Sequence, residues 1–206
     1  LPISSRLLQA GCDVAVWNRT RAKAEPLAKY GAKVVNTPTE LADRDLVFTM
    51  VAGPDDFVEV TLGPNGVLSR KDAKPRILVD STSVSEEASE HVRAEAGKRG
   101  VAMLAAPVSG NAKVVKAGKL TFVVSGPRKT FDEVQPYLDV MGIGAAYVGE
   151  GELSRICKIC HNVLLGVVIQ NLTEITVLAE KAGVPRHAFL DFINKSVMGS
   201  MFSRYK

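Results

Sequence analysis

Short β-rich runs alternate with helix-like patterns through the first 148 residues of this 206-residue chain. Strands separated by helices are typical of βαβ units, in which helices pack on a mostly parallel sheet. The predicted strands are residues 14–17, 46–50, 77–80, 101–105, 120–124 and 145–148, and the predicted helices are residues 3–10, 21–30, 39–43, 54–61, 85–99 and 128–141. The alternation therefore predicts an α/β fold with a doubly wound, mostly parallel sheet.

The pattern changes after Gly151, where strand signals stop. A helix is predicted from Leu153 to Ala182, followed by a break at Gly183-Val184-Pro185 and a shorter helix to Ser196. We therefore expect two domains, residues 1–149 and 150–206. The long helix is apolar on most faces, which is typical of a helix buried on all sides. About fifty residues cannot bury it alone, so further chain or a partner subunit must cover it.

Composition excludes several classes of protein. The 26 basic and 22 acidic residues give a net charge of +4 and are spread along the chain, which argues against nucleic-acid binding. No apolar stretch reaches the roughly 18 residues of a membrane span, so no membrane partner is expected. Three cysteines, an odd number, favour reduced thiols and a cytoplasmic location. Cys157 and Cys160 lie in an apolar helical run, where core packing is favoured over redox or metal chemistry.

Lys158 and Asn162 are four residues apart, so they share one face of the long helix, and His161 lies close to that face. A lysine is costly to bury unless it is paired or used. A partly desolvated lysine has a lowered pKa, which suits it to proton transfer. By spacing alone, a solvated lysine on the wet face of the helix is the simpler interpretation.

Further motifs precede this helix in a fixed order. Pro2 and Ala10-Gly11 frame the first helix, and the second run of β-type residues ends in Asn18-Arg19-Thr20, where a dinucleotide-binding fold contacts the adenosine ribose. The later blocks are Thr49-Met50-Val51, Asp80-Ser81-Thr82-Ser83, Ala106-Pro107-Val108-Ser109-Gly110-Asn111, Gly118-Lys119-Leu120-Thr121 with Val124-Ser125-Gly126, and finally Lys158-x-x-x-Asn162. Each motif is weak alone, but their shared order is specific.

Together these motifs resemble the β-hydroxyacid dehydrogenase family, the relatives of 3-hydroxyisobutyrate dehydrogenase. The resemblance implies a Rossmann-like sheet that lacks its first strand and glycine-rich turn, followed by the start of an all-α domain that is also incomplete. In the family the long helix contributes to assembly, so a homodimer or homotetramer is expected. The resemblance covers all 206 residues.

The resemblance also implies roles for individual residues. Lys158 would be the catalytic proton donor and acceptor, and Asn162 would hold the reacting oxygen or the lysine in line. Ser109 with the backbone N–H groups of Gly110 and Asn111 would bind the substrate carboxylate, although Ser-Gly alone is only a turn signal. His161 stands where many members have asparagine and is a further candidate for substrate contact. Met50, Val51, Ala52 and Ser83 would border the cofactor.

Arg19 indicates the cofactor. An acidic residue at this strand end binds the ribose hydroxyls of NAD, whereas an arginine accommodates the 2′-phosphate of NADP. Asn18 is not acidic and Arg19-Thr20 offers a cation and a hydroxyl, which favours NADP, with NAD as the alternative. An exposed arginine without a role is the other interpretation of Arg19.

The sequence thus predicts an NADP-preferring oxidoreductase that interconverts a small 3-hydroxy acid and its semialdehyde, or reduces glyoxylate or succinic semialdehyde. Leu165 stands where 6-phosphogluconate dehydrogenase carries a glutamate, which argues against decarboxylating chemistry. Lys158 argues against imine reductases, which usually lack it. The alternative from another class is a catalytically incompetent fragment or a non-catalytic binding module that keeps the scaffold.

Overall fold

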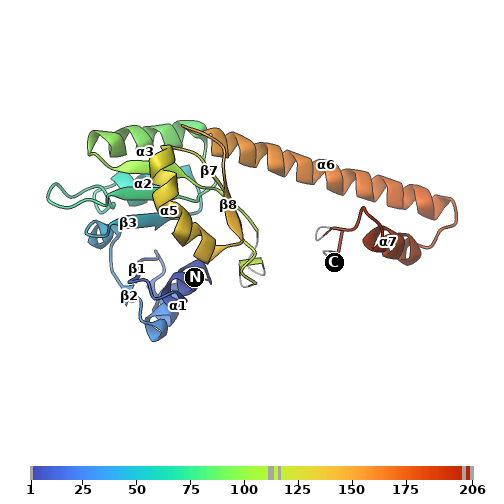
Figure 1. Cartoon of the computed structure of the whole chain (residues 1–206), viewed down its shortest axis with the longest axis horizontal. Coiled ribbons are helices and arrows are strands. Elements are labelled where there is room, and N and C mark those ends of the chain that lie inside the picture. The colour runs from blue at the N-terminus through green and yellow to red at the C-terminus, as the bar shows by residue number, and fades with distance from the viewer. Residues whose placement is uncertain (1, 111–113, 116, 201–202, 205–206) are drawn as a thin grey trace. The chain divides into compact units, whose positions relative to one another are not determined.

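The computed structural model describes residues 2–110, 114–115, 117–200 and 203–204. The chain forms two compact units, Leu1–Lys158 and Ile159–Lys206. The first unit contains all the strands assigned in the described residues, and the second consists of helix (Figure 1). The domain boundary expected at residue 149 lies just before helix α6 (Leu153–Lys181), whose first residues belong to the first unit.

Parallel strand pairing builds most of the first unit. Strands β3 (Leu46–Thr49), β4 (Ile77–Asp80) and β5 (Ala102–Ala105) form a three-stranded parallel sheet in which Thr49, Asp80 and Ala105 are in register. Apolar side chains fill both faces of β4, which is buried at all four positions, as expected of a central parallel strand. The carboxyl ends of these strands therefore lie side by side.

Two further sheets complete the unit. Strands β1 (Ala15–Val16) and β2 (Lys33–Val34) are parallel. Strand β7 (Thr121–Val124) pairs antiparallel with β6 (Val108–Ser109) and parallel with β8 (Gly144–Tyr147). A bridge between Ala105 and Ser125 links the second and third sheets. In the described residues no strand pairs with both β1 and β3, so the sheet β1-β2 and the sheet β3-β4-β5 are not joined by hydrogen bonds.

Helices cover these strands (Figure 1). They are α1 (Pro2–Gln9), α2 (Pro54–Leu62), α3 (Glu86–Lys98) and α5 (Arg128–Met141). One apolar cluster joins α5 through Phe131, Val134 and Leu138 to β4 and β7. A second joins α2 and α3 to the opposite face through Phe57 and Val92. Helices on both faces of a parallel sheet confirm the predicted Rossmann-like α/β fold.

The predicted elements and the structure differ in the short segments. All six predicted strands are present, but β2 and β6 have two residues each and were not predicted. The predicted helices at 21–30 and 39–43 are instead 3₁₀ turns: η1 (Arg21–Lys23), η2 (Glu25–Tyr30) and η3 (Pro38–Leu41). Proline stands at the start of η2 and of η3, where it removes a backbone donor. Gly31 ends η2 with a φ of 93°, which glycine adopts without strain.

The second unit begins within α6 and continues through α7 (Arg186–Lys195). Most of its apolar side chains are exposed in this single chain, among them Val163, Leu164 and Leu178. Cys157 and Cys160 are also exposed, so the predicted core packing of these thiols is not found within this chain. By length and composition alone α6 is long enough and apolar enough to cross a membrane. The expectation that no segment would pass this test is therefore wrong for α6.

Candidate active site

A cavity of about 1090 Å³ opens in the first unit between β1 and β3. Its lining includes Trp17, at the end of β1, and Thr49, at the end of β3. Ligands of open α/β sheets bind outside the carboxyl ends of the strands, where the strand order reverses. Six of the predicted cofactor residues line this cavity, namely Asn18, Arg19, Thr20, Met50, Val51 and Ala52. The seventh, Ser83, is exposed and is absent from the lining.

The turn after β1 presents Arg19 on one side of the cavity. The side chain of Asn18 accepts a hydrogen bond from the backbone N–H of Thr20 at 2.9 Å, which fixes the turn. The Arg19 side chain is 77% exposed, and its guanidinium donates to the Asp56 carboxylate, on α2, at 3.1 Å. Asp56 also lines the cavity. Arg19 is therefore accessible to a ligand in the cavity, and the Asp56 carboxylate would compete with that ligand for the guanidinium.

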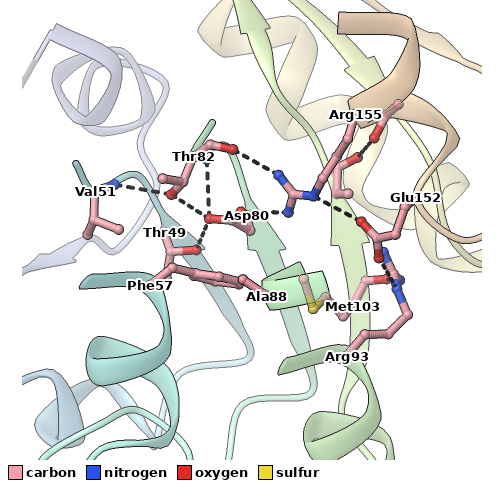
Figure 2. Close-up of polar contacts among 12 residues, drawn as sticks. Thr49, Val51, Phe57, Asp80, Thr82, Ala88, Arg93, Met103, Glu152 and Arg155 are labelled. Atoms are coloured by element: carbon pink, nitrogen blue, oxygen red, sulfur yellow. Dashed lines mark hydrogen bonds and ion pairs between the residues drawn. The ribbon is translucent and has the colours of Figure 1, made fainter. Parts of the chain in front are cut away.

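The turns after β3 and β4 are tied together by Asp80, which is wholly buried. Its Oδ1 accepts hydrogen bonds from the hydroxyls of Thr49 at 2.7 Å and Thr82 at 2.6 Å. The Thr82 hydroxyl in turn accepts from the backbone N–H of Val51 at 3.1 Å (Figure 2). The predicted cofactor segment 50–52 is therefore held by the end of the neighbouring strand.

The predicted substrate loop is described in part. Ser109 ends β6 and is half-buried, and Gly110 follows with a φ of 144°. A Cβ on Gly110 would lie 2.8 Å from Cγ1 of Val114 and 3.0 Å from Cδ1 of Leu120. Both the backbone angle and the space therefore require glycine at this position. The prediction for Asn111 lies outside the described residues.

Lys158 occupies the second turn of α6 and is half-buried. Burial lowers the pKa of its amine from the ordinary value of 10.5. This is the change that proton transfer near neutral pH requires of a lysine. His161 and Asn162 lie in the same helix within the second unit, are exposed, and approach each other at 3.2 Å between Nδ1 and Oδ1.

Sequence reasoning missed Arg155, which is 4% exposed. Its guanidinium donates to Asp80 Oδ2 at 2.8 Å, to Glu152 Oε2 at 2.9 Å and to the Thr82 carbonyl at 2.8 Å (Figure 2). Arg155 is four residues after Gly151, whereas Lys158 is seven. The structure separates the two cations: Arg155 is fully paired inside the protein, and Lys158 has no hydrogen-bond or ion-pair partner recorded among the described residues. The only sequence signal for Arg155 was that it is a basic residue within an apolar helical run, and Lys158 carries the same signal.

Glu152 joins this buried group from the start of α6. Its carboxylate also accepts from Arg93 Nε, on α3, at 2.7 Å. Burial would raise the pKa of Glu152, but the nearby Ser89 hydroxyl and the Arg93 and Arg155 guanidinium groups hold it below its ordinary value. Glu152 is therefore ionised between two cations.

One rim of the cavity offers groups that suit a dinucleotide. The cavity volume, about 1090 Å³, is slightly above the roughly 300–1,000 Å³ typical of small-molecule sites, and the core side chains of Leu7, Phe122 and Met141 also line the cavity. Arg19 and Thr20 provide a cation and donors at the β1 end, and the backbone of residues 50–52 borders the β3 end. The described residues contain no group of three or more His, Cys, Asp or Glu side chains that could hold a metal ion. Fold and site together define a domain of the dinucleotide-binding α/β class.

Comparison with known proteins agrees with this class. The family model for the NAD binding domain of 6-phosphogluconate dehydrogenase matches residues 1–149, and the chain belongs to this family. It is 31% identical over 200 residues to glyoxylate/succinic semialdehyde reductase 2 of Arabidopsis thaliana, covering 97% of this chain and 56% of the relative. It is 28% identical to 3-hydroxyisobutyrate dehydrogenase of Pseudomonas aeruginosa, covering 97% of this chain and 67% of the relative. The chain thus spans little more than half of the first of these relatives.

Solved structures agree on the fold. A Mycobacterium tuberculosis 3-hydroxyisobutyrate dehydrogenase with L-serine superposes with a TM-score of 0.85 at 29% identity, over all of this chain and 69% of that one. An imine reductase from Myxococcus stipitatus in complex with NADP⁺ has a TM-score of 0.73 at 24% identity, over 94% of this chain and 68% of that one, and shares the fold. The α/β domain followed by a helical region is therefore common to these proteins.

Proposed function

We propose that this chain carries the nucleotide domain and the proton-transfer lysine of an NADP-preferring oxidoreductase for small 3-hydroxy acids and their semialdehydes. Glyoxylate and succinic semialdehyde are included, because a relative at 31% identity is named for them. The observation that carries the proposal is Lys158, a half-buried amine whose pKa burial lowers. Arg19 supports NADP because its guanidinium is exposed at the cavity and suits a 2′-phosphate.

The chain's own residues have defined tasks in such a reaction. When bound, the nicotinamide cofactor supplies a hydride to the carbonyl carbon, or accepts one from the alcohol. As the carbonyl is reduced, the Lys158 ammonium gives a proton to the forming alkoxide oxygen, and its neutral amine takes that proton back in the reverse direction. Ser109 and the N–H of Gly110 hold the substrate carboxylate, with Asn111, His161 and Asn162 as further substrate contacts.

The assembly and surroundings of the protein belong to the same proposal. We propose a homodimer or homotetramer that works in the cytoplasm, without nucleic-acid or membrane partners. The exposed apolar side chains of α6 support self-association, because contiguous apolar surface of this kind marks an interaction site. Measuring the mass in solution by light scattering tests the assembly, and a monomer at micromolar concentration would contradict it.

The experiment that tests the function uses the protein at its full natural length. NADPH oxidation is followed with glyoxylate, succinic semialdehyde and a 3-carbon semialdehyde acid, and compared with NADH. Lys158→Ala is expected to lower kcat by roughly two to four orders of magnitude. Lys181→Ala, an exposed lysine at the far end of the same helix, serves as the control and should leave the rate unchanged. Cofactor binding without turnover would favour a non-catalytic binding module instead.

A further inference from the structure

Four charged side chains meet at the start of α6, and three of them are almost completely buried. Arg155, Asp80 and Glu152 have side chains that are 4%, 0% and 3% exposed, and Arg93 is 23% exposed. The order of contact is Asp80–Arg155–Glu152–Arg93, which runs from the end of β4 through the first turn of α6 to α3 (Figure 2). Every formal charge in this chain of contacts is therefore paired.

Further hydrogen bonds, most of them between uncharged groups, hold the same turn of the helix. The Ser154 hydroxyl donates to the carbonyl of Ala105, at the end of β5, at 2.9 Å. The Ser125 hydroxyl, after β7, accepts from the backbone N–H of Ser154 at 3.1 Å. Arg93 also donates to the carbonyl of Gly151 at 3.1 Å. The first turn of α6 is thus bonded to the ends of three strands and to α3.

Stability alone does not explain so many buried charges. Moving ions out of water costs several kcal/mol each, and apolar side chains of similar volume often stabilise a protein as well or better. What a buried, fully paired guanidinium does supply is geometry, since its planar fork fixes direction as well as distance. Arg155 uses three of its N–H donors on three different acceptors. The arrangement therefore restricts both the position and the rotation of the helix start.

Two parts of the candidate site meet at this point. On one side, Arg155 and the backbone N–H of Val51 both bond to Thr82, so the guanidinium is two contacts from the cofactor segment. On the other side, Lys158 follows Arg155 by three residues, which places it about one turn along the same helix. No other described side chain is bonded both to Asp80 and to the start of α6.

We propose that Arg155 is a positioning residue, held by Asp80 and Glu152, that sets Lys158 relative to the cofactor segment after β3. This inference rests on the proposed function for its catalytic meaning. Its structural content is independent: if Arg155 is released, the first turns of α6 lose their orientation and the Lys158 amine loses its half-buried environment. A side chain that only stabilised the fold would lower stability without moving that amine.

The test reads the surroundings of the Lys158 amine directly. The full-length protein is methylated at its lysines with ¹³C-formaldehyde, and the dimethyl-lysine resonances are recorded by NMR. Lys158→Arg identifies the Lys158 resonance by removing it. In the native protein we expect this resonance to lie apart from those of exposed lysines such as Lys181 and Lys195. In Arg155→Met and Asp80→Asn it should move to the position of the exposed lysines.

A matched control separates positioning from stability. Leu138→Ala truncates a wholly buried side chain of α5 and makes no polar contact with α6. It should lower the melting temperature and leave the Lys158 resonance in place. If Arg155→Met does not fold, Arg155→Gln decides: it keeps a hydrogen-bond donor and adds no lysine, but one amide cannot reach all three acceptors, so the resonance should still move. An unmoved resonance in a folded Arg155 variant overturns the proposal.

Failure of the positioning role of Arg155 can be distinguished from failure of the proposed function. Activity that survives Lys158→Ala would refute the catalytic role, whatever the NMR result. A resonance that stays in place in Arg155→Met, with activity lost in Lys158→Ala, would refute the positioning role and leave the catalytic one.

Discussion

The guanidinium of Arg155 and the carboxylate of Asp80 meet at 2.8 Å in the interior of the protein, although 75 residues separate them in the chain. Asp80 ends the central strand β4, and Arg155 lies in the first turn of α6. Without Arg155, Asp80 would be a buried and uncompensated charge, and without Asp80, Arg155 would have to share the Glu152 carboxylate with Arg93. The pair therefore ties the helix that carries Lys158 to the carboxyl end of the parallel sheet.

The first prediction concerns the stability that depends on this pair. Asp80→Asn removes one charge and leaves Arg155 buried, so we expect a loss of about 3–5 kcal/mol in the free energy of unfolding. Urea denaturation followed by circular dichroism measures it. As a control, Glu133→Gln breaks the exposed ion pair with Arg76 and should change the midpoint little. Equal midpoints for Asp80→Asn and the native protein would contradict the prediction.

The fold could be predicted largely from local pattern. Strand β4 is a continuous apolar run, and the helix expected at 153–182 ends within one residue of the observed α6, because a Gly-Val-Pro break follows it. Elements whose form depends on distant pairing were not predicted. Strand β2 has two residues and exists through its register with β1. The single helix predicted at 21–30 is divided in two, and Pro26 lies in the interior of the predicted span, where proline interrupts an α-helix.

The candidate site was predicted unevenly for a related reason. Lys158 was predicted from the resemblance carried by the ordered motifs, and Arg19 from its position at a strand end. Arg155 could not be predicted, since both it and Lys158 are basic residues in one apolar helix, and the sequence does not show which of them lies inside. The difference is set by Asp80 and Thr82, which reach Arg155 only in the folded chain.

A second prediction follows from the pKa of Glu152. Burial raises it, but Ser89, Arg93 and Arg155 lower it more, so the folded-state pKa lies below the ordinary value of 4.5. The stabilisation from this carboxylate is complete above the unfolded-state value and is lost as pH falls through the folded-state value. The free energy of unfolding should therefore decrease below about pH 4.5, and less steeply in Glu152→Gln.

The measurement is a series of urea titrations between pH 5 and pH 3. Glu90→Gln, an exposed carboxylate on α3, is the control and should keep the native pH dependence. Identical slopes for Glu152→Gln and the native protein would show that Glu152 does not contribute to acid unfolding.

The third prediction concerns Arg19 and Asp56, which both line the cavity and form an ion pair at 3.1 Å. Arg19→Ala removes the cation for a 2′-phosphate, so NADP⁺ should bind about ten- to a hundredfold more weakly, since a charged hydrogen bond contributes roughly 1.5–3 kcal/mol. NAD⁺ binding should change little. Asp56→Asn removes the competing carboxylate and should tighten NADP⁺ binding relative to NAD⁺. Titration calorimetry with both cofactors measures the ratio, and an unchanged ratio in Arg19→Ala would refute the assignment.

The fourth prediction is a pH dependence set by Lys158. Burial lowers the pKa of its amine from 10.5, so the titration should appear below that value. Carbonyl reduction needs the protonated form, so kcat/KM for reduction should fall as pH rises through the lowered pKa. Alcohol oxidation needs the neutral amine and should rise through the same pKa. In Lys158→Arg the guanidinium does not titrate, so any residual activity should lack this limb. If the same pH dependence of kcat/KM persists in Lys158→Arg, the titrating group is not Lys158.

The last prediction concerns the loop after β6. Gly110 has a φ of 144°, and a Cβ there would lie within 3.0 Å of Leu120 Cδ1 and still closer to Val114 Cγ1. Gly110→Ala must therefore shift the backbone whose N–H is proposed to hold the substrate carboxylate. We expect KM for the semialdehyde acid to rise at least tenfold, the equivalent of about 1.4 kcal/mol, while the affinity for the cofactor stays the same. Gly97→Ala, in α3, has open space around its Cβ and is the matched control. If KM rises equally for an uncharged aldehyde, the loop does not act through the carboxylate, and the role of Gly110 is only structural.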